Sequence, residues 1–216
     1  MKYTAVIFDL DGTLLNTLGD LRNALNHALA KRGLAERTTD EVRRFIGNGV
    51  RNLITRALPE NSSETEITDT LADFREYYNS HLNVETVPYP GIPELLCKLR
   101  ASGIKVCINS NKYDAALKEL CASHFDGLYL RAEGESAFFP RKPDPAAALS
   151  LAASCCADPS GMLYIGDSNV DVRTALNAGM TPVWVSWGFR TREEMGEELP
   201  CLCFDDAQSL SDYILA

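Results

Sequence analysis

The stretch YTAVIFDLDGTL, residues 3–14, decides the fold and carries the first two carboxylates of interest. Residues 3–8 form a short run of apolar, β-branched and aromatic side chains, which predicts a buried strand. The Asp-Gly pair at residues 11 and 12 predicts a turn directly after that strand. Asp9 and Asp11 therefore follow the carboxyl end of a strand, where open parallel sheets bind their ligands.

The rest of the chain falls into a helical part and an alternating part. Helical spacing of apolar residues predicts helices at 18–29, 39–45, 50–58 and 64–82, the last opened by a capping box of Ser63 and Glu66. From about residue 86, predicted helices, the first at 92–101, alternate with strands at 105–109, 127–131, 162–165 and 181–185. This alternation predicts an α/β fold, a doubly wound parallel sheet of Rossmann type. The predicted catalytic core is residues 1–15 and 86–216, with a small helical cap domain, residues 16–85, inserted after the first strand.

Polar residues follow three more of the predicted strands or their loops. They are Ser110 and Asn111, Lys142 in the loop RKPDP, and Asp167 with Asp171. Carboxylates that converge at one sheet edge repel one another unless a cation holds them, and oxygen ligands suit Mg²⁺. The pattern therefore predicts a magnesium site, with Lys142 and the Ser110 hydroxyl placed to hold a phosphate group.

Two aspartates separated by one residue can divide the work of phosphoryl transfer. Asp9, nearest the strand, is the candidate nucleophile, and Asp11 is the candidate acid and base for the leaving oxygen. Each motif alone has a simpler explanation, since Asp-x-Asp-Gly is usually a turn and Gly-Asp-Ser is a common helix cap. The joint pattern at four strand ends favours the catalytic interpretation.

The charge balance limits the partners of this chain. With 21 basic and 30 acidic residues the net charge is -9, which argues against a broad nucleic-acid-binding face and against binding to anionic lipid. The apolar stretch near the N-terminus is too short for a signal sequence or a membrane span, so we expect a cytoplasmic protein. A small phosphorylated metabolite is the expected partner, and the sequence leaves open a monomer or a homodimer.

Four segments closely resemble the motifs of the haloacid dehalogenase superfamily, in the same order. They are DLDGTL at 9–14, SNK at 110–112, KPDP at 142–145 and GDSNVD at 166–171. The resemblance implies that Asp9 is nucleophile and metal ligand, and that Asp11 is acid and base and gives its main-chain carbonyl to Mg²⁺. It implies that Ser110, Asn111 and Lys142 bind phosphate, that Asp167 binds the metal, and that Asp171 acts on the metal through water or by orienting its ligands.

The helical insertion is similar to the cap of the phosphoglycolate phosphatase branch, and FIGNGVR at 45–51 resembles its cap loop. The resemblance implies a phosphatase, with phosphoglycolate as the first candidate substrate and Arg44, Asn48 and Arg51 as candidate substrate contacts. Pyrophosphatase, nucleotidase and sugar-phosphate phosphatase or phosphomutase activities remain as alternatives on the same scaffold. A phospho-receiver module, which accepts phosphate without turning over, is the non-enzymatic alternative.

Overall fold

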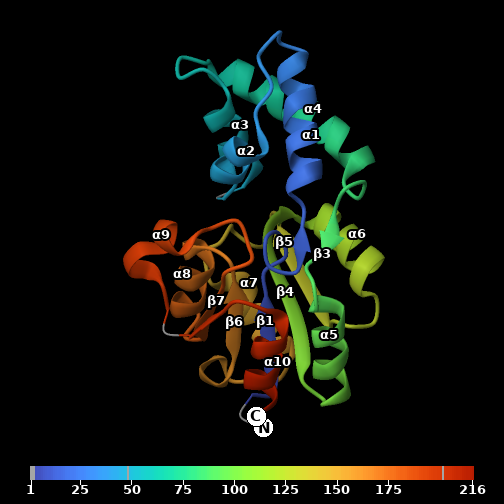
Figure 1. The fold of residues 1–216 in the computed structure, drawn as a ribbon, viewed down its shortest axis with the longest axis vertical. Coiled ribbons are helices and arrows are strands. Elements are labelled where there is room, and N and C mark those ends of the chain that lie inside the picture. The colour runs from blue at the N-terminus through green and yellow to red at the C-terminus, as the bar shows by residue number, and fades with distance from the viewer. Residues whose placement is uncertain (1–2, 48, 201) are drawn as a thin grey trace. The chain divides into compact units, whose positions relative to one another are not determined.

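The computed structural model describes residues 3–47, 49–200 and 202–216. The chain divides into two compact units, Met1–Leu15 with Pro88–Ala216 and the intervening Asn16–Val87. The larger unit contains a six-stranded sheet in the order β5-β4-β1-β6-β7-β8 (Figure 1). Its strands are β1 (Ala5–Phe8), β4 (Lys105–Tyr113), β5 (Arg131–Glu135), β6 (Leu163–Gly166), β7 (Thr181–Val185) and β8 (Leu202–Phe204).

Strand β1 lies in the middle of this sheet and pairs in parallel with β4 and β6. Phe8 is opposite Ile108 on one side and Ile165 on the other, and the N–H of Asp9 donates to the Ile165 carbonyl at 2.8 Å. All five strand pairings recorded in the described sheet are parallel. The segments that follow β1, β4 and β6 therefore emerge at the same edge, as the sequence predicts.

Helices cover both faces of the sheet. They are α5 (Ile92–Ala101), α6 (Asp114–Phe125), α7 (Ala146–Ser154), α8 (Asn169–Asn177), α9 (Arg192–Met195) and α10 (Ala207–Leu215), with short 3-10 helices at Pro159–Gly161 and Gly196–Glu198. Helices α7 and α8 share one buried cluster with β1, in which Ile7, Leu151 and Ala175 pack together. Helices α5 and α10 lie over the opposite face (Figure 1). The predicted doubly wound α/β fold is confirmed.

One predicted strand is wrong. The apolar run at 127–131 forms a turn and an irregular connection after α6, and its Leu130 is 53% exposed. The strand is β5, whose sequence RAEGE begins where the predicted strand ends. Its Ala132 and Glu133 are buried although β5 is an edge strand, because helices α6 and α7 pack against it and cover it whatever its own polarity.

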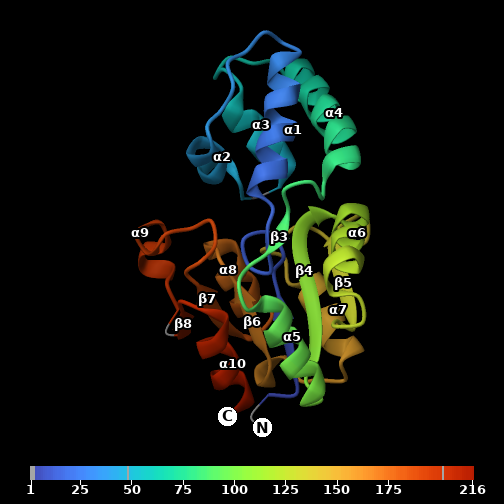
Figure 2. The same cartoon turned by 45° about the vertical axis from the view of Figure 1, so that its right-hand side comes forward.

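The smaller unit is helical and consists of α1 (Leu18–Ala30), α2 (Thr39–Phe45), α3 (Val50–Ala57) and α4 (Glu64–His81) (Figure 2). The predicted capping box of Ser63 and Glu66 opens α4. Two short strands, β2 (Leu15–Asn16) and β3 (Val87–Pro88), pair where the chain passes between the units. Within the described residues, none of the helices combines the length and the apolar character that a membrane span requires.

The C-terminal end of the helical unit is fixed by one buried carboxylate. Asp20 of α1 is 2% exposed and accepts hydrogen bonds from the backbone N–H groups of Val84, Glu85 and Thr86 at 2.9 to 3.1 Å. The Thr86 hydroxyl donates to the same carboxylate at 2.7 Å. This side chain satisfies three backbone donors of the segment just before β3.

Candidate active site

Asp9, directly after β1, is buried and contacts a buried lysine. Lys142 Nζ lies 2.7 Å from Asp9 Oδ1 and 2.7 Å from Asp171 Oδ1, and it donates to the Asn109 carbonyl at 3.2 Å. Asp9 and Lys142 are each 6% exposed. A single ammonium group thus links the end of β1, the middle of β4 and the start of α8.

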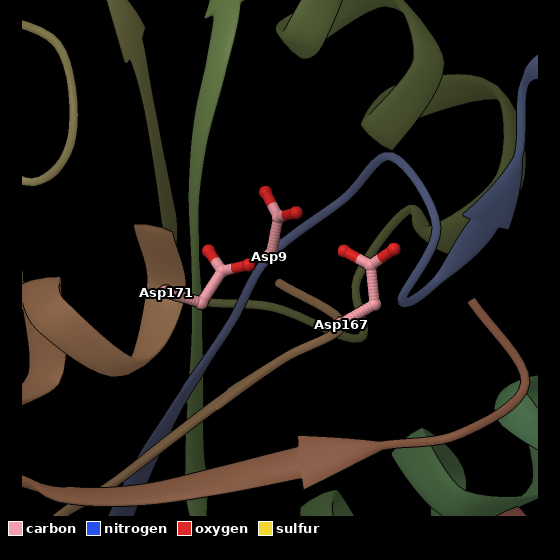
Figure 3. Close-up of side chains that lie close together, drawn as sticks. All are labelled: Asp9, Asp167 and Asp171. Atoms are coloured by element: carbon pink, nitrogen blue, oxygen red, sulfur yellow. The ribbon is translucent and has the colours of Figure 1, made fainter. Parts of the chain in front are cut away.

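Three carboxylates from two distant parts of the chain meet at this edge of the sheet, Asp9 from the N-terminal part and Asp167 with Asp171 from the C-terminal part. One oxygen each from Asp9, Asp167 and Asp171 can be chosen so that all lie within 4.8 Å of one another. Figure 3 shows the three side chains projecting to the same side from three separate segments. Asp167 follows β6, and Asp171 lies in the first turn of α8. This is an oxygen-only donor set of the kind that Mg²⁺ prefers.

Local hydrogen bonds orient both acids that follow β6. Asp171 Oδ2 accepts from the N–H and the hydroxyl of Ser168 at 3.1 and 2.6 Å, closing a capping box at the start of α8. Asp171 thereby turns Oδ1 toward Lys142. The Asp167 carbonyl accepts from Trp184 Nε1 at 2.9 Å, which ties the loop after β6 to β7.

The site holds more negative than positive charge. Burial raises the pKa of Asp9 well above its usual value, opposed by Lys142, and the charges of Asp171 and Asp167 raise it further. Burial, together with the charge of Asp171, also raises the pKa of Asp167 to about 7. Burial lowers the pKa of Lys142, but Asp171 and Asp9 more than offset this and raise it above the ordinary range. A bound cation would offset the negative charge of the three buried acids, so the residues fit a divalent metal ion.

The segment at the end of β4 contains the expected phosphate-binding residues. Ser110 is buried, and its Oγ accepts from the N–H of Lys112 at 3.2 Å, so the hydroxyl proton is directed elsewhere. The Asn111 side chain contacts the backbone of Lys142, accepting from its N–H at 2.7 Å and donating to its carbonyl at 3.3 Å. Asn111 therefore fixes the loop that carries Lys142, and its contact with phosphate stays a prediction.

Two features of the site were not assigned a role from the sequence. Lys112 is buried, and its Nζ lies 3.0 Å from Asp11 Oδ1. After β7, the N–H of Phe189 donates to Asp167 Oδ2 at 2.6 Å. The position of Lys112 directly after Ser110 and Asn111 in the sequence could have indicated that it belongs to the site. The backbone N–H of Phe189 could not be predicted in this way, because almost every residue type has a backbone N–H.

Gly188 makes the close approach of the loop after β7 possible. A Cβ added at this position would lie 2.6 Å from Asp167 Oδ2, and nearer still to Asp167 Cβ and the Gly12 carbonyl. Any larger residue there would displace the loop or the carboxylate. The same loop is tied to the segment after β1 by Trp187, whose Nε1 donates to the Thr13 carbonyl at 3.0 Å.

The expected substrate contacts of the helical unit remain predictions. Arg44 is exposed on α2. Arg51, in α3, forms an ion pair with Glu64 at the start of α4. Asn48 lies outside the described residues.

Comparison with known proteins agrees with this fold and site. The family described as haloacid dehalogenase-like hydrolase matches residues 6–185. A protein of Psychrobacter arcticus named phosphoglycolate phosphatase is 31% identical over 223 residues, covering 100% of this chain and 97% of its own. A protein of the same name from Pseudomonas syringae pv. syringae is 33% identical, covering 95% of this chain and 77% of its own.

A crystal structure from Lactobacillus delbrueckii subsp. bulgaricus, described as a candidate phosphoglycolate phosphatase, is similar over the whole chain. The two share 34% sequence identity and superpose with a TM-score of 0.96, covering 100% of both chains. The sheet, its acidic edge and these relatives define the class of the protein as a hydrolase. The chain belongs to the haloacid dehalogenase-like hydrolase family.

Proposed function

We propose that this chain hydrolyses a small phosphorylated metabolite with Mg²⁺, through a phospho-aspartate formed on Asp9. The chain is a hydrolase of phosphoric monoester bonds, consistent with its family and with relatives at 31% to 34% identity that are named phosphoglycolate phosphatase. The observation that carries the mechanism is the buried set of Asp9, Asp167 and Asp171, of which Asp9 and Asp171 contact Lys142 Nζ.

Asp9 and Asp167 would bind Mg²⁺ through their side chains, Asp11 through its main-chain carbonyl, and Asp171 through water or by orienting those ligands. The ion supplies positive charge that offsets the phosphate oxygens. Lys142 and the Ser110 hydroxyl hold the same oxygens, so the phosphorus is fixed in front of the Asp9 carboxylate.

The reaction takes place in two displacements. A carboxylate oxygen of Asp9 forms a bond to phosphorus, the ester P–O bond breaks, and the leaving oxygen takes a proton from Asp11. Water then attacks the phosphoryl group, the Asp9–phosphorus bond breaks, and Asp11 receives the proton from that water. One ester and one water thus give one alcohol and one inorganic phosphate, and both aspartates return to their initial states.

Phosphoglycolate is the first candidate substrate because the relatives named above carry that name. A pyrophosphatase, a nucleotidase and a sugar-phosphate phosphatase would use the same carboxylates and the same lysine. A phosphomutase would return the phosphoryl group to sugar, and a phospho-receiver module would keep it on Asp9. Asp11, beside the nucleophile, favours release to water because it can activate that water.

A phosphate-release screen tests the proposal. Wild-type enzyme with Mg²⁺ should release inorganic phosphate continuously from one member of a panel of phosphoglycolate, pyrophosphate, nucleoside monophosphates and hexose phosphates. EDTA should abolish this release and added Mg²⁺ should restore it. Phosphoglycolate giving no phosphate while another ester does would reject the first candidate substrate, and a sugar phosphate isomer as product would indicate a mutase.

The covalent role of Asp9 is tested with two variants. Asp9→Asn should abolish turnover, with a loss of at least about 10³-fold, because an amide cannot replace the nucleophile. Asp158→Asn is the matched control, since Asp158 only caps the short helix Pro159–Gly161, and it should keep wild-type activity. An Asp9→Asn variant that retains most of its activity would rule out the phospho-aspartate.

A further inference from the structure

Lys112 is a buried cation that the proposed mechanism does not use. Its side chain is 3% exposed, and its Nζ lies 3.0 Å from Asp11 Oδ1, on a carboxylate that is 18% exposed. Lysine is rarely buried unless it is paired. A buried ion pair contributes little net stability compared with apolar side chains of similar size, so stability alone gives no reason for this pair.

The backbone places Lys112 by an irregularity of the sheet. Strand β4 advances from Asn109 to Tyr113 while its neighbour β5 advances only from Glu133 to Glu135, so β4 carries a bulge between those two pairs. A bulge breaks the strict alternation of side chains and redirects them, and bulges are frequent beside active sites. Lys112 lies inside this bulge and is thereby aimed differently from a residue in a regular strand.

A glycine on β5 secures the bulge. A Cβ added at Gly134 would lie 2.6 Å from the Lys112 carbonyl and 2.7 Å from the Asp114 Cα, so only glycine allows this approach. The N–H of Gly134 also donates to Asp114 Oδ1 at 3.2 Å. On the other side, the N–H of Lys112 donates to Ser110 Oγ. The position of Lys112 is therefore fixed by contacts both before and after it.

We infer that Lys112 is a positioning residue for Asp11, which rests on the proposed function. The ammonium group holds Asp11 through Oδ1 and so keeps the carboxyl group in the orientation that meets the leaving oxygen of the substrate. Each lysine then pairs with a different aspartate, Lys142 with the proposed nucleophile Asp9 and Lys112 with the proposed acid Asp11. Lys112 acts through Asp11 and makes no contact with the reacting atoms.

The test compares two substrates that differ in their need for an acid. The leaving group of p-nitrophenyl phosphate departs without a proton, whereas that of an alkyl phosphate such as phosphoglycolate needs one. Lys112→Met should lower kcat for the alkyl ester by about 10- to 100-fold, as expected when a catalytic group is misplaced by about 1 Å. It should lower kcat for p-nitrophenyl phosphate by less than about 3-fold and leave both KM values within about 3-fold.

Three further variants sharpen the result. Lys112→Arg retains the positive charge and should recover most of the activity on the alkyl ester. Lys112→Met added to Asp11→Asn should cost less than about 2-fold more, because the two residues act as a unit. Lys118→Met, which removes an exposed lysine paired with Asp114 on α6, is the matched control and should change nothing.

The outcomes separate this inference from the proposed function. Equal losses of kcat on both substrates, additive losses in the double variant, or a selective rise in KM for the carboxylate-bearing ester would each overturn it, the last by indicating that Lys112 binds substrate. If Asp11→Asn itself shows no dependence on the leaving group, the proposed function fails instead. Thermal unfolding is measured for every variant, and Lys112→Gln replaces Lys112→Met if the latter does not fold.

Discussion

Gly188→Ala should weaken metal binding without touching a charged group. Gly188 has no positive φ, so alanine adds no backbone strain, and the whole effect comes from its Cβ. That atom would lie 2.2 Å from Asp167 Cβ, 2.4 Å from the Gly12 carbonyl oxygen and 2.6 Å from Asp167 Oδ2, roughly 1 Å or more inside ordinary contact distances. A rotation of the Asp167 carboxylate cannot relieve all three contacts, so the loop after β7 must move away from Asp167 and Gly12 by about 1 Å. This movement strains the hydrogen bond from the N–H of Phe189 to Asp167 Oδ2.

The size of the effect follows from this displacement. Overpacking of a buried site costs about 1–3 kcal/mol of stability. In a chain of this length, the middle of that range, about 2 kcal/mol, lowers Tm by about 4–8 °C. A metal ligand moved by about 1 Å should raise the Mg²⁺ concentration for half-maximal activity at least about 10-fold and lower kcat by up to about 100-fold.

The assay is a Mg²⁺ titration of phosphate release, together with the rise in Tm that Mg²⁺ produces. Gly161→Ala is the matched control, because a Cβ at Gly161 would meet nothing within 4 Å and the residue has no positive φ. It should behave as wild type in both measurements. A Gly188→Ala variant with wild-type Mg²⁺ dependence would refute the reasoning, because Asp167 would then not be held in place by this loop.

Two other predictions concern metal, pH and the helical unit. Burial and the charge of Asp171 raise the pKa of Asp167 from 3.8 to about 7, so without metal the folded chain holds a proton on this carboxyl group. The contribution of that proton to stability is full below pH 3.8 and is lost as pH rises through about 7. Mg²⁺ bound at Asp167 as proposed would replace that proton. The increase in Tm on adding Mg²⁺ should therefore be larger at about pH 8 than at about pH 5.5, and an increase that does not grow with pH would contradict this. Asp20→Ala leaves the backbone donors of Val84, Glu85 and Thr86 without their carboxylate partner, the last of them buried, and should lower the free energy of unfolding in urea by about 2–4 kcal/mol. Asp73→Ala, which breaks ion pairs with Lys31 and Arg32 on the helical surface, should cost no more than about 1 kcal/mol, and equal losses for the two variants would argue against the role of Asp20.

The local sequence pattern was sufficient to predict the bounds of those helices and strands whose own apolar residues decide which positions are buried. The strand predicted at 181–185 coincides with β7, and the helices predicted at 39–45 and 92–101 coincide with α2 and α5. These segments carry clear periodicity and clear ends, such as the glycine before α5. Short elements near the end of the chain, such as β8, are too brief to give a periodic signal.

The pattern failed where the neighbours of a segment, and not its own residues, decide its state. GLYL at 127–130 has the composition of a strand, yet the polar sequence RAEGE pairs with β4. The strand predicted at 105–109 continues as β4 to Tyr113, because pairing with β5 resumes at Tyr113 beyond the bulge at residues 110–112. Neither the pairing partner nor the bulge is encoded in the local spacing.

By itself the sequence determined which residues are candidates for the chemistry, because side-chain type and position after a predicted strand or in its loop are both readable along the chain. Asp9, Lys142 and Asp167 are named by that rule alone. Only the tertiary structure decided which side chains contact one another. The Lys142 ammonium group bridges Asp9 and Asp171, the Asn111 side chain accepts from the backbone N–H of Lys142, and Lys112 pairs with Asp11. Such contacts join segments far apart in the chain, and their distances are set by strand register, by bulges and by glycines that admit close approach, which residue type does not specify.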